Sequence, residues 1–152
     1  MQLFPLAVVT ALSLSTITLA QEKKIECKDL PPAVEQTVVT QSQGATVKGF
    51  SQEKENGQTY YEAEMTINGH SKDVLIDANG AVVEIEEQVT LDSLSSAVRD
   101  GLQAQAGPGK IVEVESLTKH DRLVAYEAKV QTAGKKKEIQ VGPDAKPLDH
   151  EE

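Results

Sequence analysis

Apolar residues recur at helical spacing at two places along the chain. Leu30, Val34 and Val38 are four residues apart, which is typical of the buried face of one helix. A second apolar face runs through residues 94–102, directly after capping candidates at positions 92–93. The chain is therefore expected to contain two helices, separated by a longer stretch with a different pattern.

The stretches that follow each helix alternate between apolar and polar residues, which indicates half-buried strands. The alternation is strictest at 58–67, where Tyr61, Ala63 and Met65 are apolar and the intervening positions are mostly polar. Asn68-Gly69 after this stretch is a strong hairpin signal, because both turn positions favour a positive φ. The pattern predicts four strands after each helix, at 47–52, 58–67, 72–77 and 81–88 in the first half and at 110–116, 123–132, 136–141 and 146–149 in the second.

The two halves of the chain are similar to each other. The sequence at 60–65, YYEAEM, recurs at 125–130 as AYEAKV. Such self-similarity predicts two copies of one supersecondary unit that share a sheet and a core. The expected fold class is α+β, with two tandem repeats, each a helix plus a four-stranded antiparallel meander, forming one curved sheet with the helices on one face. We place the repeats at 30–88 and 89–152, and Pro147 favours an edge position for the last strand.

The N-terminal stretch has a composition of its own. Residues 1–20 contain no charged residue and end in small side chains, which is typical of a secretory signal peptide cleaved after Ala20. A membrane anchor is the alternative, because the stretch is nearly long enough to span a bilayer. Residues 21–29 are expected to form a flexible segment. Both alternatives put the rest of the chain outside the cytoplasm, so a periplasmic or secreted location is expected.

Charge and cysteine content narrow the class of partner. The formal net charge is −9, which disfavours binding to nucleic acid or to an anionic membrane surface. The chain has no Trp and only two Phe, so it lacks platforms for stacking bases. Its single cysteine, Cys27, excludes an internal disulfide, and in an oxidising compartment it either stays free or cross-links to a second chain.

No catalytic or metal-binding motif is found in the sequence. His70, His120 and His150 are far apart, and no Ser lies in a nucleophile-elbow setting. The stretch from Asp77 to Gly80 begins like a calcium loop, but the twelfth position is not the Glu that such a loop requires. We therefore interpret it as a hairpin turn, and we expect no enzymatic activity, no cofactor and no metal site.

Alternation along the strands puts many carboxylates on the sheet face that does not carry the helices. Like charges on one sheet face repel each other, so the arrangement either serves solubility or attracts a basic partner or cations. Tyr60 is the one large amphipathic side chain expected there, and Tyr is a favoured interface anchor. The residues expected to bind a partner on this open sheet face are Tyr60, Glu62, Glu64, Asp73, Glu84, Glu86 and Glu127.

A set of short motifs in the first half resembles a known family. It comprises a helix that begins with the residues from Leu30 to Val34, a strand with Tyr61-Glu62-Ala63, a hairpin at Gly69, and a turn from Asp77 to Gly80. This combination resembles the tandem PepSY-like repeat of exported bacterial proteins, a group that is similar in fold to the beta-lactamase-inhibitor proteins. The resemblance covers about residues 30–152.

The second half departs from this family pattern, since Gly142 replaces the Asp of the last turn and Ala145 replaces its Gly. The resemblance implies a curved antiparallel sheet with helices behind it and an open front for a protein partner. Members of the family are thought to bind or restrain peptidases or other extracytoplasmic enzymes.

Two functions are therefore expected. The first is an exported, non-enzymatic protein-binding module, with inhibition of a peptidase or another extracytoplasmic enzyme as one form of it. The alternative is a periplasmic sensor or carrier that binds cations or small ligands on the acidic sheet face. The expected partner is an extracytoplasmic protein, and neither nucleic acid nor, after signal cleavage, a membrane is expected to bind.

Overall fold

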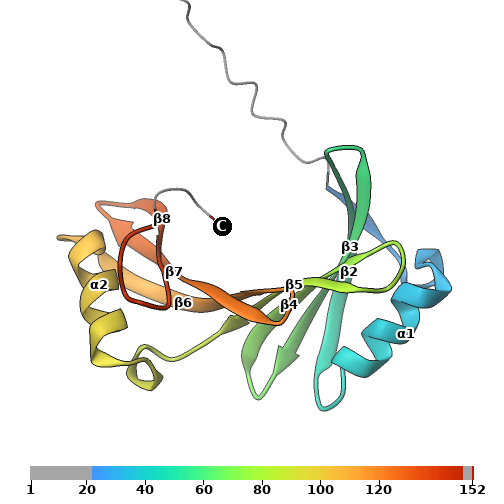
Figure 1. Ribbon diagram of the computed structural model, residues 1–152, viewed down its shortest axis with the longest axis horizontal. Helices are drawn as coiled ribbons and strands as arrows, with labels where there is room; N and C mark the ends of the chain where they lie inside the picture. Colours follow the sequence, from blue (N-terminus) through green and yellow to red (C-terminus); the bar gives the residue numbers. More distant parts are fainter. Residues whose placement is uncertain (1–21, 149–151) are drawn as a thin grey trace, which may run out of the picture.

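One antiparallel sheet of eight strands, in the order of the sequence from β1 to β8, forms the body of the protein (Figure 1). The computed structural model describes residues 22–148 and residue 152, so the expected signal peptide and its cleavage site at Ala20 lie outside the described residues. The strands are β1 (Lys23–Ile25), β2 (Thr46–Glu55), β3 (Gln58–Ile67), β4 (His70–Asp77), β5 (Val82–Gln88), β6 (Lys110–Lys119), β7 (Arg122–Thr132) and β8 (Lys135–Val141). The helices are α1 (Pro32–Gln41) and α2 (Ser96–Ala106), and the short 3-10 turns η1 (Cys27–Asp29) and η2 (Leu91–Ser93) precede them.

The prediction of two helix-plus-four-strand repeats is wrong. The part of the chain that the structure describes is mostly sheet, with two short helices, and in it three strands follow α2. Of the stretch expected to form a last strand at 146–149, the described residues 146–148 contribute a bridge between Val141 and Pro147, and a proline cannot donate to a strand ladder. At the other end, residues 23–25 belong to the segment expected to be flexible, but they form β1, which pairs with β2.

The hairpin between β3 and β4 forms where the sequence predicts it. Asn68 and Gly69 have φ values of 52° and 86°, the positive values that a two-residue hairpin turn requires. The turn between β2 and β3 is of the same kind, with Asn56 at 49° and Gly57 at 81°. These tight turns keep consecutive strands antiparallel, so side chains on one face of the sheet keep a constant register along its length.

Both helices lie on the outer side of the curved sheet, α1 at one end and α2 at the other (Figure 1). Pro32 occupies the first turn of α1, where its missing amide hydrogen costs nothing, and Val34 and Val38 are the buried residues of this helix. The N-cap of α2 is Ser95, whose hydroxyl accepts a hydrogen bond from the amide of Val98 at 3.3 Å. The capping candidates expected at 92–93 instead belong to η2.

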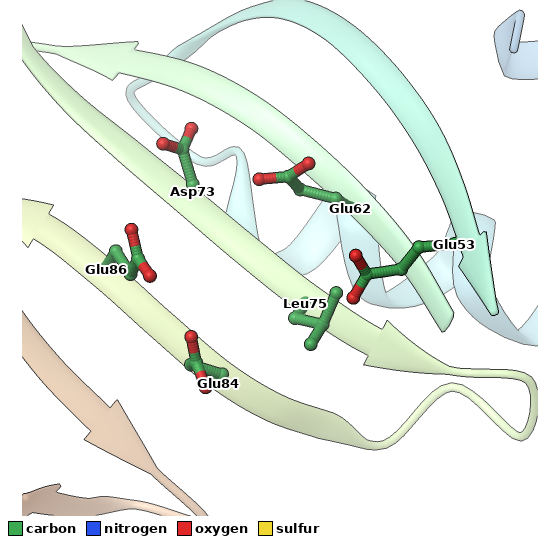
Figure 2. Close-up of a pocket in the computed structure, with 6 residues that line it drawn as sticks. All are labelled: Glu53, Glu62, Asp73, Leu75, Glu84 and Glu86. Carbon is green, nitrogen blue, oxygen red and sulfur yellow. The ribbon is translucent and has the colours of Figure 1, made fainter. Parts of the chain in front are cut away.

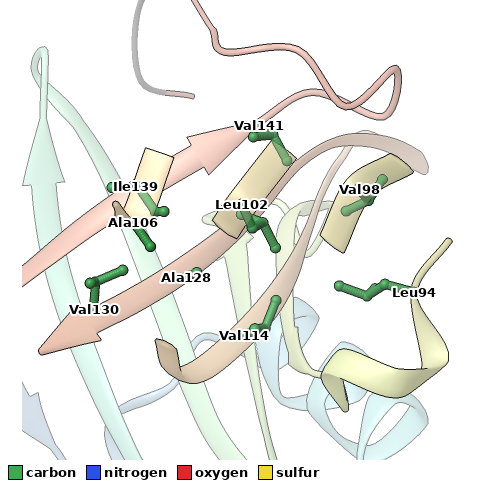
Figure 3. Close-up of a cluster of buried hydrophobic side chains, with 9 residues drawn as sticks. All are labelled: Leu94, Val98, Leu102, Ala106, Val114, Ala128, Val130, Ile139 and Val141. Atoms are coloured by element: carbon green, nitrogen blue, oxygen red, sulfur yellow. The ribbon is translucent and has the colours of Figure 1, made fainter. Parts of the chain in front are cut away.

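The helices cover two separate hydrophobic clusters, whereas the sequence predicts a single shared core. The first cluster joins α1 to strands of the first half, and its buried members are Leu30, Val34, Val38, Ala63, Met65, Val74 and Ile76. The second joins α2 to β6, β7 and β8, as Figure 3 shows, and its buried members are Leu94, Val98, Leu102, Ala106, Val114, Ala128, Val130, Ile139 and Val141. Among the described residues, the last residue in the sequence that belongs to the first cluster or packs on it is Ile85. The first residue that packs on the second cluster is Val89.

The turn after β4 is locked against α1. Gly80 has a φ of 87°, and a Cβ atom built on it would lie 2.6 Å from the carbonyl oxygen of Ala33. The Thr37 hydroxyl donates a hydrogen bond to the carbonyl oxygen of Gly80 at 2.6 Å. This close approach of a turn to a helix requires a residue without a side chain at position 80.

The two edges of the sheet are β1 and β8. Lysines occupy both edges, with Lys23 and Lys24 in β1 and three consecutive lysines, residues 135–137, at the start of β8. No helix in the described part of the chain is long and apolar enough to cross a membrane. Cys27, in η1, is a free and exposed thiol.

Candidate functional site

The face of the sheet opposite the helices, which we call the concave face, carries the candidate site. Glu62 and Glu64 alternate along β3 with Ala63 and Met65, which are buried in the first cluster, so the two glutamates point to the other side. Directly opposite residues in an antiparallel sheet project from the same face, so cross-strand pairing identifies the rest of the surface. The concave face is thus set by the strand pattern and the register together.

Carboxylates occupy adjacent positions in rows that run across the strands. One row pairs Glu64 with Asp73 and Asp73 with Glu86, across β3, β4 and β5. The next row pairs Glu62 with Leu75 and Leu75 with Glu84. Like charges directly opposite each other in a sheet are destabilising, so these rows oppose the folding of the strands that carry them.

Figure 2 shows side chains of this face arranged around a hollow over β2, β3, β4 and β5. Its volume is about 160 Å³, and it is lined by Glu53, Glu62, Asp73, Leu75, Glu84 and Glu86. The apolar Leu75 lies among five carboxylates, so the hollow offers a small apolar surface surrounded by negative charge.

Burial and mutual repulsion make several of these carboxylates hard to ionise. Burial, followed by repulsion from Glu62, Glu115 and Glu64, raises the pKa of Asp73 to about 6. Burial, a hydrogen bond with Glu84 and the negative charges of Glu84, Glu115 and Glu127 raise the pKa of Glu86 to about 8.

Three further carboxylates on this face have a raised pKa, in each case chiefly because of burial: Glu53, Glu62 and Glu127. Hydrogen bonds from Ser51 to Glu62, at 2.8 Å, and from Gln140 to Glu127, at 2.9 Å, offset this effect in part. The concave face therefore holds carboxylates whose charge changes near neutral pH.

In the described part of the chain, lysines pair with Glu84 at one side of the hollow and with two carboxylates beyond it. Lys119 lies 3.6 Å from Glu84, and Lys129 lies 2.6 Å from Glu113 and 3.2 Å from Glu115. Glu53, Glu62, Asp73 and Glu86 form no ion pair in the described part of the chain. The center of the hollow is thus left without a cation of its own.

The structure places all seven predicted partner-binding residues on the concave face, and it brings four of them together. Glu62, Asp73, Glu84 and Glu86 line the hollow. Glu64 and Glu127 lie in neighbouring rows, opposite Asp73 and Gln140 respectively. Tyr60 lies nearer the hairpin end of the sheet, opposite Glu53 and Asp77, and its hydroxyl hydrogen-bonds to Gln58.

Sequence reasoning missed three residues of this face. Glu53 lies in β2, where the alternation is imperfect, so its direction could not be inferred. Leu75 faces the carboxylates although it is apolar, and Glu115 is only 5 % exposed although it is charged. The direction of the Leu75 side chain could have been predicted from the sequence. Leu75 lies two residues from both Asp73 and Asp77, and residues two apart in a strand share a face.

A smaller group of acidic side chains lies beside the hollow. Oxygen atoms of Glu22, Glu62 and Glu64 lie within 4.8 Å of one another, close enough to share a cation.

The turn from Asp77 to Gly80 is the hairpin turn predicted from the sequence, since the Asp77 carboxylate accepts hydrogen bonds from the amides of Asn79 and Ala81, at 2.8 and 2.9 Å.

The two histidines that the structure describes, His70 and His120, are not among the residues of this site. His70 begins β4, and His120 lies in the turn between β6 and β7 with a φ of 47°. His150 lies outside the described residues.

The raised pKa values predict that this face destabilises the protein as the pH rises. Asp73 and Glu86 bind a proton more readily in the folded than in the unfolded chain, so stability falls from about pH 4 until both groups are ionised above about pH 8. The variant Asp73→Asn/Glu86→Gln should therefore be more stable than the wild type at pH 8, by about 1 kcal/mol once solvent screening is allowed for. Its advantage in thermal melting should shrink as the pH is lowered to 4.5.

The matched control is Glu35→Gln/Asp100→Asn, which removes the same formal charge from the exposed surface of the two helices. This control should follow the wild type at every pH. An advantage that is equal for both variants would show that net charge, and not the concave face, sets the pH dependence.

No protein-family model matches the chain, and no curated protein sequence matches it. Solved structures do match its fold. A DUF2874 family protein from Bacteroides ovatus is 20% identical with a TM-score of 0.62, over 79% of this chain and 85% of that one. A protein from Bacteroides eggerthii with a provisional periplasmic assignment is 19% identical with a TM-score of 0.64, over 78% and 86% of the two chains.

A BLIP-like protein from Bacteroides fragilis is also similar, with 21% identity and a TM-score of 0.57 over 76% of this chain and 81% of that one. At this level of identity the likeness shows the fold, which is BLIP-like as expected from the resemblance to the beta-lactamase-inhibitor proteins. The PepSY-like repeat is not among the descriptions of these neighbours and stays a prediction. The periplasmic description of the B. eggerthii protein agrees with the periplasmic or secreted location predicted from the sequence.

Proposed function

We propose that the protein is an exported, non-enzymatic binding module whose concave face binds basic side chains of an extracytoplasmic protein. One observation carries this proposal: half-buried carboxylates of the hollow, Glu62, Asp73 and Glu86 among them, have no cation paired with them in the described part of the chain. An arginine or lysine from a partner would relieve the repulsion between them. The free protein thus bears an electrostatic cost that the complex would remove.

The shape of the hollow agrees with this class of ligand. A lysine or arginine side chain has an apolar stem and a charged end, so its stem can cover Leu75 while its charge meets the surrounding carboxylates. The periplasmic and BLIP-like descriptions of the structural neighbours support an exported binding protein, and inhibition of an extracytoplasmic enzyme is the form of binding that this likeness favours.

The test uses octa-arginine as a probe and two variants of equal net charge. Glu62→Lys/Glu64→Lys reverses charge on the concave face, and Glu35→Lys/Asp100→Lys reverses the same number of charges on the exposed sides of α1 and α2. In low salt the first variant should bind the peptide at least about tenfold more weakly than the wild type, a difference of about 1.4 kcal/mol. The second should lose much less affinity.

Equal losses in the two variants would overturn the proposal, because binding would then depend on net charge alone.

The group formed by Glu22, Glu62 and Glu64 favours a second candidate function, the binding of a divalent cation. A calcium titration of the wild type separates the two functions: a rise in melting temperature that Glu62→Lys/Glu64→Lys abolishes, without any binding of octa-arginine to the wild type, would favour the cation.

A further inference from the structure

The two halves of the protein meet at a seam between β5 and β6. Five residue pairs join these strands, from Glu84 opposite Lys119 to Gln88 opposite Glu115. Among the described residues neither hydrophobic cluster extends across this seam, since each consists of residues from one half only. Hydrogen bonds therefore connect the halves more than side-chain packing does.

The contacts that flank the ladder at this seam are also polar. The amide of Val89 donates to the carbonyl of Val114 at 2.9 Å, and the amide of His120 donates to the carbonyl of Val83 at 3.0 Å. On the concave side the Ser71 hydroxyl lies 3.5 Å from a carboxylate oxygen of Glu115, and the ion pair between Glu84 and Lys119 spans 3.6 Å. Leu117, on β6, is buried at the seam but belongs to neither cluster.

Register shifts lie on both sides of the seam. One falls between Leu75 and Ile76 in the pairing of β4 with β5, and another between Leu117 and Thr118 in the pairing of β6 with β7. Such irregularities bend a strand and interrupt its ladder locally. Together with a seam that neither cluster crosses among the described residues, these irregularities mark a place where the sheet could change its curvature, in the manner of a hinge.

Carboxylates of both halves lie on the concave face near this seam and influence one another electrostatically. Asp73 and Glu86 lie on the first side, and Glu115 pairs with Glu127 on the second. The charged groups that act on Asp73 and Glu86 come from β3, β5, β6 and β7, and they are Glu62, Glu64, Glu84, Glu115, Glu127 and Lys129. Five of these groups are carboxylates and one is a lysine, and Lys119 pairs with Glu84, so negative charge is in excess over the seam. Ionisation of further carboxylates would add to the repulsion between the two sides.

We infer that the sheet bends about the β5–β6 seam in response to the ionisation of these carboxylates, so that the concave face is more open at alkaline pH and more closed at acid pH. The biological role of this bending rests on the proposed function, because opening would expose the binding face. The structural evidence for the bending is independent of that function. The pKa values of Asp73 and Glu86, raised to about 6 and about 8, place this response between pH 5 and pH 8.5, where the two groups change charge.

The experiment measures the distance between the helices without any ligand. Spin labels are attached to cysteines that replace the exposed residues Gln36 on α1 and Gln103 on α2, in a Cys27→Ser background. The distance between the two labels is measured by pulsed electron paramagnetic resonance. The mean distance should be shorter at pH 5 than at pH 8.5, by several ångström. The same labels in Asp73→Asn/Glu86→Gln should give a short distance at both values of pH.

An unchanged distance in the labelled wild type would overturn the inference. So would a pH-dependent distance that persists in Asp73→Asn/Glu86→Gln. The labelled variant Glu35→Gln/Asp100→Asn should keep the response of the wild type, because its lost charges lie outside the concave face. Since no octa-arginine is present, failure of the binding experiment leaves this result intact, and the reverse also holds.

Discussion

Replacement of Leu102 by alanine is expected to lower the free energy of unfolding by about 3 kcal/mol, within the range found for large-to-small changes in protein cores. Leu102 is fully buried, and Figure 3 shows it between α2 and the strands of the second half. The change removes buried apolar surface and leaves a cavity, while the helix propensity hardly changes. Urea unfolding followed by circular dichroism measures the loss.

Val39→Ala is the matched control for this substitution, because Val39 also lies in a helix but is 64% exposed. Its effect should stay within about 0.5 kcal/mol. A loss of less than about 1 kcal/mol for Leu102→Ala would contradict the second cluster as described. Because the two clusters are separate, Leu102→Ala should also melt the second half before the first, which probes in the two halves would report as different midpoints.

Gly80→Ala should also destabilise the protein by about 3 kcal/mol. The positive φ of 87° costs a non-glycine residue about 1–2 kcal/mol, and the new Cβ would meet the carbonyl oxygen of Ala33 at 2.6 Å. The clash is with helix backbone, so no side chain can rotate to relieve it. Thermal melting or urea unfolding of the purified variant gives the size of the effect.

Gly69→Ala separates the two causes. Gly69 has a φ of 86°, but nothing lies within 4 Å of a Cβ built there, so this variant bears the conformational cost alone. It should lose about 1 kcal/mol, and the remaining difference measures the contact between the turn and α1. Equal losses in the two variants would show that this contact contributes nothing.

Local patterns predicted much of the sheet. The boundaries of β3 agree with the alternation at 58–67, and the turn at Asn68-Gly69 forms as expected, because both features depend on residues close in sequence. The side of the sheet on which Glu62, Asp73 and Glu86 lie could be inferred for the same reason, since alternation determines the direction of a side chain.

Features that depend on distant contacts were not predictable in this way. β1 is only three residues long and its lysines carry no periodic signal, so its pairing with β2 comes from tertiary structure. The similarity between the halves suggested a fourth strand in the second, but the described residues 146–148 form a bridge at Pro147, which cannot donate to a ladder. Alternation shows which face of a strand is buried but not which helix covers it, and so two cores were mistaken for one.

The lysines at the two edges of the sheet affect how copies of the protein meet one another. A strand edge exposes hydrogen-bonding groups that could pair with another chain, and such pairing leads to fibres. Here each edge is basic, with Lys23 and Lys24 on β1 and residues 135–137 on β8, so two molecules that approach edge to edge repel each other. Molecules with a sheet of this length can therefore avoid edge-to-edge aggregation at high concentration, even though the sheet has two open edges.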